Sequence, residues 1–569
     1  MKLTGAEIIC ETLARVGVQH IFGYPGGAIL PAYDALGRSP IHHILVRHEQ
    51  GATHMADGYA RAGGGVGTAL VTSGPGATNM VTGIATAMLD SSPIVCITGQ
   101  VSSKVLGSDA FQEVDITGIT MPITKHNVVV THAEDIAHTI REAFVIAASG
   151  RPGPVLVDIT KDAQQGTCEF DWETSAPRLP VKRKRAVNLD AEFAQAIELI
   201  NSAKRPVILA GHGIVISGAM EIFREFVRAG DIPVALTLLG LGAFPASDPL
   251  NLGMMGMHGE AWVNHAIQDS DLLIAVGMRF DDRVTGDLRT YATHARKIHI
   301  EIDQAEINKN VKVDVALVGD ARQVLQRLLP HMEKRDRSEW HCYIRKLKGD
   351  VAVRDIQNLP DTGHLFAAHV INDLWKETRG EALVVTDVGQ HQMWEAQYYH
   401  HNYPRSLVTS GGLGTMGFAL PAAIGAKVAR PEAEVWVIVG DGGFQMTMCE
   451  LATIVQEKLE LKIAIINNGY LGMVRQWQEF FYAKRYVATP LVAPDFCALA
   501  NAFGIRSEKI TTRREAVSAV RTARETPETV LLDFRVEQED SVYPMVPGGA
   551  SLHEMIRRPT PLVETSQDS

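Results

Sequence analysis

Two oxygen-bearing side chains follow two predicted neighbouring strands in the last third of the sequence. Asp441 follows the apolar run 435–439 and Gly440, and Asn468 lies 27 positions further on (468 − 441 = 27), directly after a second apolar run. One helix and one strand would fill that interval, so both side chains are expected at the carboxyl edge of neighbouring parallel strands, where doubly wound sheets bind ligands. Mg²⁺ prefers such oxygen ligands and usually bridges to a phosphate. The pair therefore predicts a magnesium site that serves a diphosphate group.

The glycines around Asp441 fit the same interpretation. Gly440, Gly442 and Gly443 would let the main chain approach a diphosphate and donate N–H groups to it. By itself a Gly-Asp-Gly turn is a weak signal, because both residue types are common in ordinary turns. The paired Asn467 and Asn468 at this distance favour ligand binding over an ordinary turn.

A carboxylate in the first fifty residues is a second candidate. Glu49 lies in the run Arg47–Ala52, where a predicted strand gives way to a helix. A buried carboxylate that hydrogen-bonds a ring nitrogen of a ligand is a general acid–base arrangement with a tuned pKa. The alternative is an ordinary glutamate at a helix start, which the helix dipole favours.

These motifs resemble those of the acetohydroxyacid synthase catalytic subunits, a family of thiamine-diphosphate enzymes. The upstream run Gly417–Ala423 completes the resemblance to the thiamine-diphosphate signature, and further similar blocks span nearly the whole chain. These blocks are 23–28, 109–113, 150–154, 257–259, 279–286, 411–417, 472–477 and 542–547. The resemblance implies that pyruvate is decarboxylated and the remaining two-carbon unit is ligated to pyruvate or 2-oxobutanoate, the first common step of valine, leucine and isoleucine biosynthesis.

The resemblance also implies roles for single residues around thiamine diphosphate. Mg²⁺ would be held by the side chains of Asp441 and Asn468 and the carbonyl of Tyr470, and Glu49 would hydrogen-bond the pyrimidine ring. The other residues implied to contact this cofactor are Gln390, His391, Met416, Gly440, Gly442, Gly443 and Met473. Further catalytic roles fall to Gly27, Gln112 and Lys161. Loop polarity for Gln390 and His391, a core methionine for Met416 and a linker lysine for Lys161 stay open as alternatives.

A substrate pocket is implied in the same way. Its apolar wall, which would keep water from the reacting centre, is expected to consist of Phe111, Met473, Val474 and Trp477. Arg283 would pair with the carboxylate of the acceptor, because a guanidinium suits a planar bidentate contact; the alternative is an ion pair with Asp281 or Asp282. Trp477 would press on the acceptor's alkyl group, where one methylene is worth about 1–3 kcal/mol, or it is a core aromatic residue.

The middle of the chain is expected to bind FAD without a net redox step. A short Gly-x-Gly loop after a predicted strand is weak evidence by itself, so this assignment rests on the resemblance. The implied FAD residues are Arg151, Gly211, His212, Gly213, Thr237, Leu238, Met257, His258, Arg279, Glu301, Asp303 and Asp320. His212 stands where the family usually has glycine, so the sequence departs from the family's pattern in this loop.

The resemblance implies partners as well as ligands. In the family, one chain's third domain holds the diphosphate and the partner's first domain holds the pyrimidine. An obligate homodimer is therefore expected, with a tetramer left open, and so is a separate small regulatory subunit.

The elements that position these residues are expected to form three doubly wound parallel-sheet α/β domains. Short, nearly continuous apolar runs alternate with helix-length segments, which is typical of parallel sheets covered on both faces. We expect a pyrimidine-binding domain at 1–165, a central FAD-binding domain at 190–335, a diphosphate- and Mg²⁺-binding domain at 362–550 and a tail at 551–569. The stretch 161–190, with the basic run 182–185, is predicted to be a linker, and the polar stretch 334–362 separates the second domain from the third.

Composition narrows the class of protein. The net charge of −11 is spread along 569 residues, so no broad basic face is available for a nucleic acid. Six scattered cysteines without a Cys-x-x-Cys pair indicate a reducing, cytoplasmic location. No window approaches eighteen consecutive apolar residues, and the N-terminus opens with the capping box Thr4–Glu7 of a helix, so neither a membrane span nor an export signal is expected.

Two other functions stay open. A thiamine-diphosphate and FAD pyruvate oxidase would share the fold but pass electrons to the flavin. A cofactor-binding regulatory protein without turnover is the non-enzymatic alternative, although the presence of Glu49, Asp441 and Asn468 together speaks against it.

Overall fold

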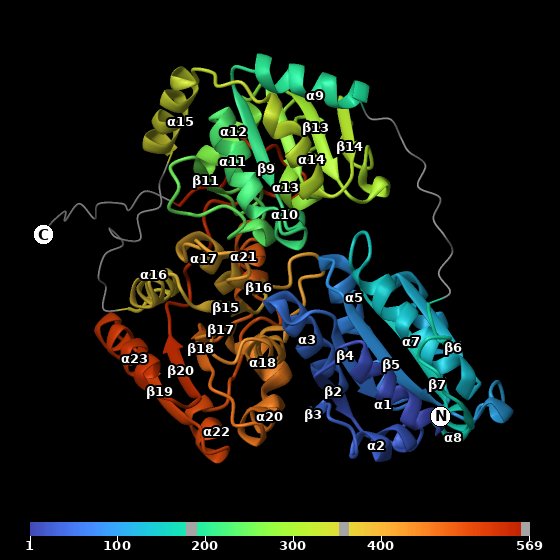
Figure 1. Ribbon diagram of the computed structural model, residues 1–569. Helices are drawn as coiled ribbons and strands as arrows, with labels where there is room; N and C mark the ends of the chain where they lie inside the picture. Colours follow the sequence, from blue (N-terminus) through green and yellow to red (C-terminus); the bar gives the residue numbers. More distant parts are fainter. Residues whose placement is uncertain (178–189, 352–363, 559–569) are drawn as a thin grey trace, which may run out of the picture.

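The protein folds into three α/β units, each built on its own sheet (Figure 1). The structure, a computed structural model, describes residues 1–177, 190–351 and 364–558. Each of the three main sheets has six strands, and every strand pairing in them is parallel. This confirms the predicted fold class. The basic run 182–185 and the part of the predicted tail beyond residue 558 lie outside the described residues.

The first and third sheets have the same topology. The first has the order β3-β2-β4-β5-β7-β6, from strands β2 (His20–Tyr24), β3 (His42–Leu45), β4 (Gly67–Val71), β5 (Ile94–Gln100), β6 (His126–Val130) and β7 (Val155–Thr160). The third has the order β16-β15-β17-β18-β20-β19, from strands β15 (Leu383–Thr386), β16 (Leu407–Thr409), β17 (Val435–Gly440), β18 (Lys462–Asn467), β19 (Arg506–Ile510) and β20 (Val530–Arg535). In both, the chain reverses direction across the sheet after the second strand. A crevice for a ligand therefore opens between β2 and β4 and between β15 and β17.

The middle sheet has a different order, β11-β10-β9-β12-β13-β14. Its strands are β9 (Pro206–Ala210), β10 (Val234–Leu236), β11 (Asn251–Met254), β12 (Leu272–Val276), β13 (Arg296–Glu301) and β14 (Val315–Val318). Counted from its first strand this is the order 3-2-1-4-5-6, which is the arrangement of dinucleotide-binding folds. Its crevice opens between β9 and β12.

Helices cover both faces of each sheet, as continuous apolar strands require. In the first unit they are α1 (Gly5–Arg15), α2 (Leu30–Leu36), α3 (Glu49–Tyr59), α4 (Pro75–Asn79), α5 (Val81–Asp90), α6 (Ile116–Thr120) and α7 (Ala133–Ala148). In the middle unit they are α9 (Asp190–Ser202), α10 (Gly213–Ile216), α11 (Met220–Gly230), α12 (Ala261–Gln268), α13 (Asp282–Thr285) and α14 (Ala321–Leu328). In the third unit they are α16 (Ala367–Thr378), α17 (Gln390–Tyr398), α18 (Ala419–Ala429), α19 (Asp441–Thr447), α20 (Leu451–Gln456), α21 (Gly472–Phe481), α22 (Phe496–Ala502) and α23 (Arg513–Glu525). In the described ranges, none of the helices has both the length and the apolar character that crossing a membrane requires.

The prediction of a linker over residues 161–190 was wrong for the first part of this stretch. Helix α8 (Lys161–Gln165) is followed by β8 (Thr167–Glu169), which pairs antiparallel with β1 (Lys2–Thr4). The N-terminal capping box of α1 is present as expected, with the Glu7 amide donating to the Thr4 hydroxyl at 3.2 Å. The short two-stranded sheet satisfies main-chain groups just before α1 and just after α8, and Phe170 is buried beside it, so this segment belongs to the first unit.

Two further segments pack more tightly than their polarity suggested. The predicted connector 334–362 begins with α15 (Ser338–Val351), whose Trp340 is buried and donates its indole N–H to the Pro206 carbonyl at 3.0 Å. The first part of the predicted tail also folds back, since Leu552 is buried in the middle unit's core. In both cases a few apolar side chains are enough to dock a mostly polar segment.

The first and third units share one core within this chain. Helices α3 and α18 pack so closely that a Cβ atom on Gly58 would lie 1.9 Å from the Ala422 carbonyl oxygen. Met55 and Ala56 from one side and Phe418 and Ala422 from the other belong to a single buried cluster. The relative position of these two units is therefore set by core packing.

Candidate functional site

A cavity of about 950 Å³ lies where the three units meet. The first unit contributes residues 89–91, 148 and 150–152 to its wall. The middle unit contributes the carboxyl ends of β9 and β12, and the third unit contributes those of β15, β17 and β18. This size is at the upper end for small-molecule pockets. The two crevices of the middle and third sheets thus open into one shared space.

The predicted metal ligands lie together in this wall. Asp441 directly follows β17, Asn468 directly follows β18, and Gly440 pairs with Ile466 in the register of these neighbouring strands. Asp441 is buried, burial raises its pKa to about 7, and its Oδ2 atom has no hydrogen-bond partner among the described residues. A buried carboxylate oxygen without a partner is costly unless a cation or proton joins it. The pair therefore fits a bound cation.

The composition of the ligand set favours Mg²⁺ over metals that need a full protein cage. In the parts of the chain that the structure describes, no group of three or more His, Cys, Asp or Glu side chains could hold an ion. Mg²⁺ is usually bound by one or two carboxylates together with phosphate oxygens and waters. Asp441, Asn468 and the main chain at Tyr470, which also lines the cavity, match that requirement.

Asn468 is oriented by a chain of amides. Its Nδ2 donates to Gln390 Oε1 at 3.2 Å, and Gln390 Nε2 donates to Gln476 Oε1 at 2.9 Å. Its Oδ1 accepts the Tyr470 N–H at 3.1 Å. A Cβ atom on Gly472 would lie 2.2 Å from Gln390 Oε1, so any side chain at this position would displace the amide of Gln390.

His391 lies at the crevice between β15 and β17. Burial lowers its pKa to about 3, so the ring is neutral near pH 7. Its Nε2 accepts the Gly440 N–H at 3.3 Å, which leaves the ring proton on Nδ1. Gln390, His391, Met416, Gly440, Gly442, Gly443 and Met473 all line the cavity, so the structure brings these predicted residues together.

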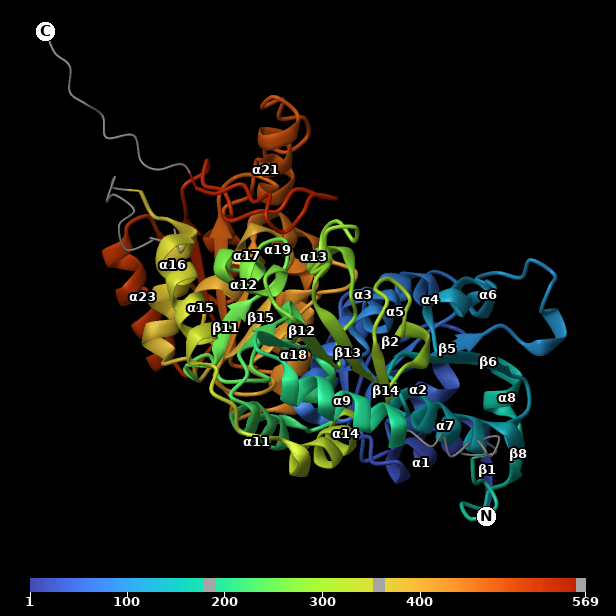
Figure 2. The ribbon, with the colours of Figure 1, turned by 90° about the horizontal axis from the view of Figure 1, so that it is seen from above.

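The predicted substrate residues divide into two groups. Met473, Val474 and Trp477 project from α21 into the cavity wall, and this helix stands out from the body of the molecule in Figure 2. Arg283 lines the same cavity from α13, and its side chain is 61% exposed. The alternative ion pair exists, since Arg283 Nη1 lies 3.4 Å from Asp282 Oδ2, but an exposed pair of this kind is weak. Its guanidinium is therefore available to a ligand.

The middle unit supplies the dinucleotide-type part of the wall. The loop Gly211–Gly213 after β9 packs on Gly277 after β12, where a Cβ atom on Gly213 would lie 2.6 Å from the Gly277 α-carbon. His212 Nδ1 lies 3.0 Å from the Leu239 carbonyl, and burial lowers the pKa of this imidazole to about 4. The departure from glycine is thus accommodated by a neutral ring held to the neighbouring turn.

Most of the other predicted FAD residues share this space. The cavity is lined by Arg151, His212, Gly213, Thr237, Leu238, Met257, His258, Arg279, Glu301 and Asp320, whereas Gly211 and Asp303 are outside its lining. Arg151 reaches across from the first unit and pairs with Glu306 at 2.9 Å. The strand order, the close glycine contact and this lining fit a dinucleotide cofactor.

Five of the predicted catalytic and substrate residues lie elsewhere. Glu49, Gly27, Gln112, Phe111 and Lys161 are outside the cavity lining and follow the carboxyl ends of β3, β2, β5 and β7. Glu49 begins α3, and its Oε2 accepts the Asn79 side-chain N–H at 2.9 Å. Gln112 lies over the turn before α4, since a Cβ atom on Gly74 would be 2.8 Å from its carbonyl oxygen, and Phe111 is 88% exposed. The predicted site is therefore divided between two sheet edges.

Sequence reasoning missed several residues of the cavity region. Asp387 is buried and accepts the N–H groups of Gly417 at 3.0 Å and Ala419 at 2.9 Å. Its place directly after an apolar strand, just before Gln390 and His391, was a usable signal. Gln476 and Glu306 carry no such signal, because only their partners, Gln390 and Arg151, show what they do.

Comparisons with known proteins agree with this architecture. Three models of the thiamine pyrophosphate enzymes match the chain: the N-terminal TPP binding domain at residues 3–119, the central domain at 193–328 and the C-terminal TPP binding domain at 387–534. The chain is 49% identical to the acetolactate synthase large subunit of Corynebacterium glutamicum over 97% of this chain and 89% of that protein. It is 47% identical to the acetolactate synthase of Mycobacterium bovis over 97% and 91% of the two chains. It is 45% identical to the acetolactate synthase isozyme 2 large subunit of Escherichia coli over 98% and 100%.

Proposed function

The chain belongs to the thiamine pyrophosphate enzymes and, within them, to the acetolactate synthase large subunits, and from this premise we propose how its own residues perform the reaction. It is a thiamine-diphosphate-dependent carboligase: it decarboxylates pyruvate and ligates the remaining two-carbon unit to a second 2-oxo acid, a step of branched-chain amino acid biosynthesis. Thiamine diphosphate, when bound, supplies the electron sink that decarboxylation needs.

Asp441, Asn468 and the Tyr470 carbonyl would hold a Mg²⁺ ion that serves the diphosphate of this cofactor. The observation that carries this assignment is the buried Oδ2 of Asp441, which lacks a hydrogen-bond partner in the described chain and lies beside Asn468 at the edge of β17 and β18. Gln390 fixes the orientation of Asn468, and His391 accepts the Gly440 N–H at the crevice. These donors and ligands all belong to one chain.

Glu49 acts on the cofactor that a second copy of the chain holds. Its carboxylate would hydrogen-bond the pyrimidine nitrogen of the bound cofactor and would hold or move a proton there, which is the work of a general acid–base group. Support comes from the division of the site, since Asp441 lines the cavity of its own chain and Glu49 does not. A two-fold symmetric dimer would bring each such pair together twice.

The substrate-facing side chains bind, orient and exclude water. Met473, Val474 and Trp477 form an apolar wall on α21, and Phe111, which is largely exposed in one chain, is buried against it by the second copy. Arg283 orients the second 2-oxo acid through its carboxylate. Gly27, Gln112 and Lys161 complete the first unit's edge around the reacting groups.

FAD occupies the middle unit's part of the cavity. The dinucleotide strand order and the contact between Gly213 and Gly277 support this placement. The similarity to large subunits supports a separate small regulatory subunit as a partner. A cytoplasmic location and 2-oxobutanoate as an acceptor remain predictions.

One incubation tests the function directly. Purified protein with pyruvate, Mg²⁺, thiamine diphosphate and FAD is expected to form acetolactate. Acetate with reduced flavin or peroxide would instead identify an oxidase, and bound thiamine diphosphate without any product would identify a binding protein. Asp441→Ala is the control, because it should abolish Mg²⁺-dependent binding of thiamine diphosphate along with the product.

A further inference from the structure

A glycine-rich segment forms part of the cavity wall between the middle and third units. We define the glycine loop as residues 410–416, which follow β16 and contain Gly411, Gly412 and Gly414. The loop lines the cavity and ends at Met416. Glycine loses more backbone freedom than other residues when it becomes ordered, so a defined shape here needs specific contacts.

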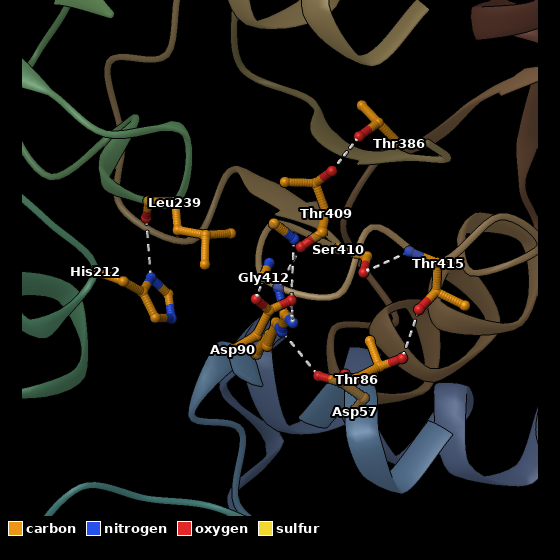
Figure 3. Close-up of polar contacts among 12 residues, drawn as sticks. Asp57, Thr86, Asp90, His212, Leu239, Thr386, Thr409, Ser410, Gly412 and Thr415 are labelled. Carbon is orange, nitrogen blue, oxygen red and sulfur yellow. Dashed lines mark hydrogen bonds and ion pairs between the residues drawn. The ribbon is translucent and has the colours of Figure 1, made fainter. Parts of the chain in front are cut away.

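The first unit supplies such a contact through Asp90, at the end of α5. The side chain of Asp90 is fully buried, its Oδ1 accepts the Gly412 N–H at 2.6 Å, and its Oδ2 accepts the Gly411 N–H at 3.1 Å (Figure 3). Hydrogen bonds from main-chain N–H groups to a charged carboxylate are among the stronger ones in proteins. The loop has little room for change at this point, since a Cβ atom on Gly412 would lie 2.8 Å from the Leu89 Cβ.

Arg61 holds Asp90 in place and also reaches the third unit. Its Nη2 lies 2.5 Å from Asp90 Oδ2, its Nε lies 2.7 Å from Asp57 Oδ1, and its Nη1 donates to the Thr409 carbonyl at 2.5 Å. All three side chains are almost completely buried. A buried charge that loses its partner is strongly destabilising, so the Arg61 guanidinium supports the Asp90 carboxylate at the end of a helix, where the dipole would disfavour a negative charge.

The glycine loop is tied at several points along its length. Thr86 of the first unit lies 2.7 Å from Thr415, hydroxyl to hydroxyl, and the Thr415 N–H donates to the Ser410 hydroxyl at 3.0 Å (Figure 3). Just beyond Met416, Asp387 accepts the Gly417 N–H. Two buried carboxylates from different units thus bracket a loop that has few large side chains of its own.

We propose that Asp90, supported by Arg61, is a positioning residue that shapes the glycine loop of its own chain so that Met416 and the loop's main chain meet thiamine diphosphate. The assignment to this cofactor rests on the proposed function, whereas the contacts of Asp90 and Arg61 with the glycine loop do not. The first unit then serves two sites: Asp90 acts on the site of its own chain, and Glu49 acts on that of the second copy.

Asp90→Asn tests this role, with Asp57→Asn as the matched control. Both carboxylates are fully buried and contact the same guanidinium, but only Asp90 contacts the glycine loop. In Asp90→Asn an N–H₂ group replaces one acceptor and faces donors, so both main-chain bonds cannot be kept. In the cofactor-free protein, hydrogen–deuterium exchange of the peptide 409–419 is expected to become faster in Asp90→Asn, and to stay within about twofold of the unaltered protein in Asp57→Asn.

A binding measurement completes the test. With Mg²⁺ present, the Kd of thiamine diphosphate is expected to rise about tenfold or more in Asp90→Asn and to change less than about threefold in Asp57→Asn. Both variants are expected to melt at a lower temperature than the unaltered protein. Equal effects of the two substitutions, or unchanged exchange in Asp90→Asn, would overturn the proposal. Asp57, Arg61 and Asp90 would then have a purely structural role.

A milder variant covers the case in which Asp90→Asn does not fold. Thr86→Val removes the hydroxyl contact with Thr415 at nearly constant side-chain shape. A rise in hydrogen–deuterium exchange of the same peptide, smaller than that expected for Asp90→Asn, would support the positioning of the glycine loop by the first unit. Unchanged exchange would contradict it. Failure of the proposed function would look different. The unaltered protein would then not bind thiamine diphosphate, while the exchange experiment on cofactor-free protein would still decide the role of Asp90.

Discussion

The first and third units share a strand order but use the carboxyl edges of their sheets differently. In the third unit the edge at β15 and β17 faces the cavity, and Asp441 is 1% exposed there. In the first unit the corresponding edge carries Glu49 and Gln112 outside the cavity lining, and the nearby Phe111 is 88% exposed.

The difference shows what topology decides and what packing decides. The reversal of strand order offers a crevice in both sheets. The middle unit closes the crevice of the third sheet, and α3 is already committed to α18 through the shared core, so the first sheet's edge cannot turn toward its own chain's cavity. The proposed second copy of the chain would complete both edges.

The largest effect is expected at the edge of the first sheet, which lies outside the cavity lining. Glu49→Gln should lower turnover by about 10²–10⁴, because Gln keeps the shape but cannot exchange a proton with the pyrimidine nitrogen. The initial rate of acetolactate formation and the Kd of thiamine diphosphate are measured together, and the Kd should change only a few-fold. Glu7→Gln is the control, since Glu7 also lies in the first turn of a helix and should leave turnover within about twofold. A loss below tenfold for Glu49→Gln would mean that the two edges do not act on one cofactor.

Mixing the two edges tests the dimer directly. Glu49→Gln and Asp441→Ala chains are each expected to be almost inactive. If they exchange at random, half of the dimers are mixed and each mixed dimer has one intact site of two, so activity should recover to about a quarter of that of the unaltered protein. Activity that stays at the level of the single variants would place both residues in the site of one chain and break the comparison.

Substitutions in the third unit's part of the cavity should change acceptor preference rather than abolish turnover. Trp477→Leu is expected to change the preference between pyruvate and 2-oxobutanoate as acceptors by about tenfold or more, because one methylene in a fitted pocket is worth about 1–3 kcal/mol. Competition between the two acids measures it. Phe481→Leu, one turn further along α21 with its ring 5.2 Å from that of Trp477, should leave the preference unchanged because Phe481 is outside the cavity lining. An equal shift in both variants would mean that Trp477 only stabilises the helix.

The smallest effect concerns the middle unit. His212→Gly removes a neutral ring whose hydrogen bond goes to the Leu239 carbonyl, so the Kd of FAD should change by less than about tenfold. Flavin fluorescence measures the change. A larger loss of affinity would show that this imidazole contacts the flavin itself, and FAD binding would then depend on a residue that departs from the glycine usual in the family.

Much of the fold could be predicted because its signals are local. The apolar runs near 435–439 and 461–466 became β17 and β18, and Asp441 and Asn468 lie at their ends as the spacing indicated. The sequence did not reveal where a polar segment docks through a few apolar side chains, as at α15 with Trp340 and at Leu552. Periodicity cannot recognise such docking, because it depends on a complementary surface elsewhere in the chain.

The sequence by itself determined the strands, the order of the units and which residues could bind a metal or a diphosphate, since these depend on residue types at short spacing. Only the tertiary structure decided which edges meet. Arg61 contacts Thr409 across 348 positions and Arg151 contacts Glu306 across 155, and neither pair follows from a local pattern. Contacts of this kind arise when whole apolar faces pack, and many different sequences satisfy the same packing, so the partners become visible only in the folded chain.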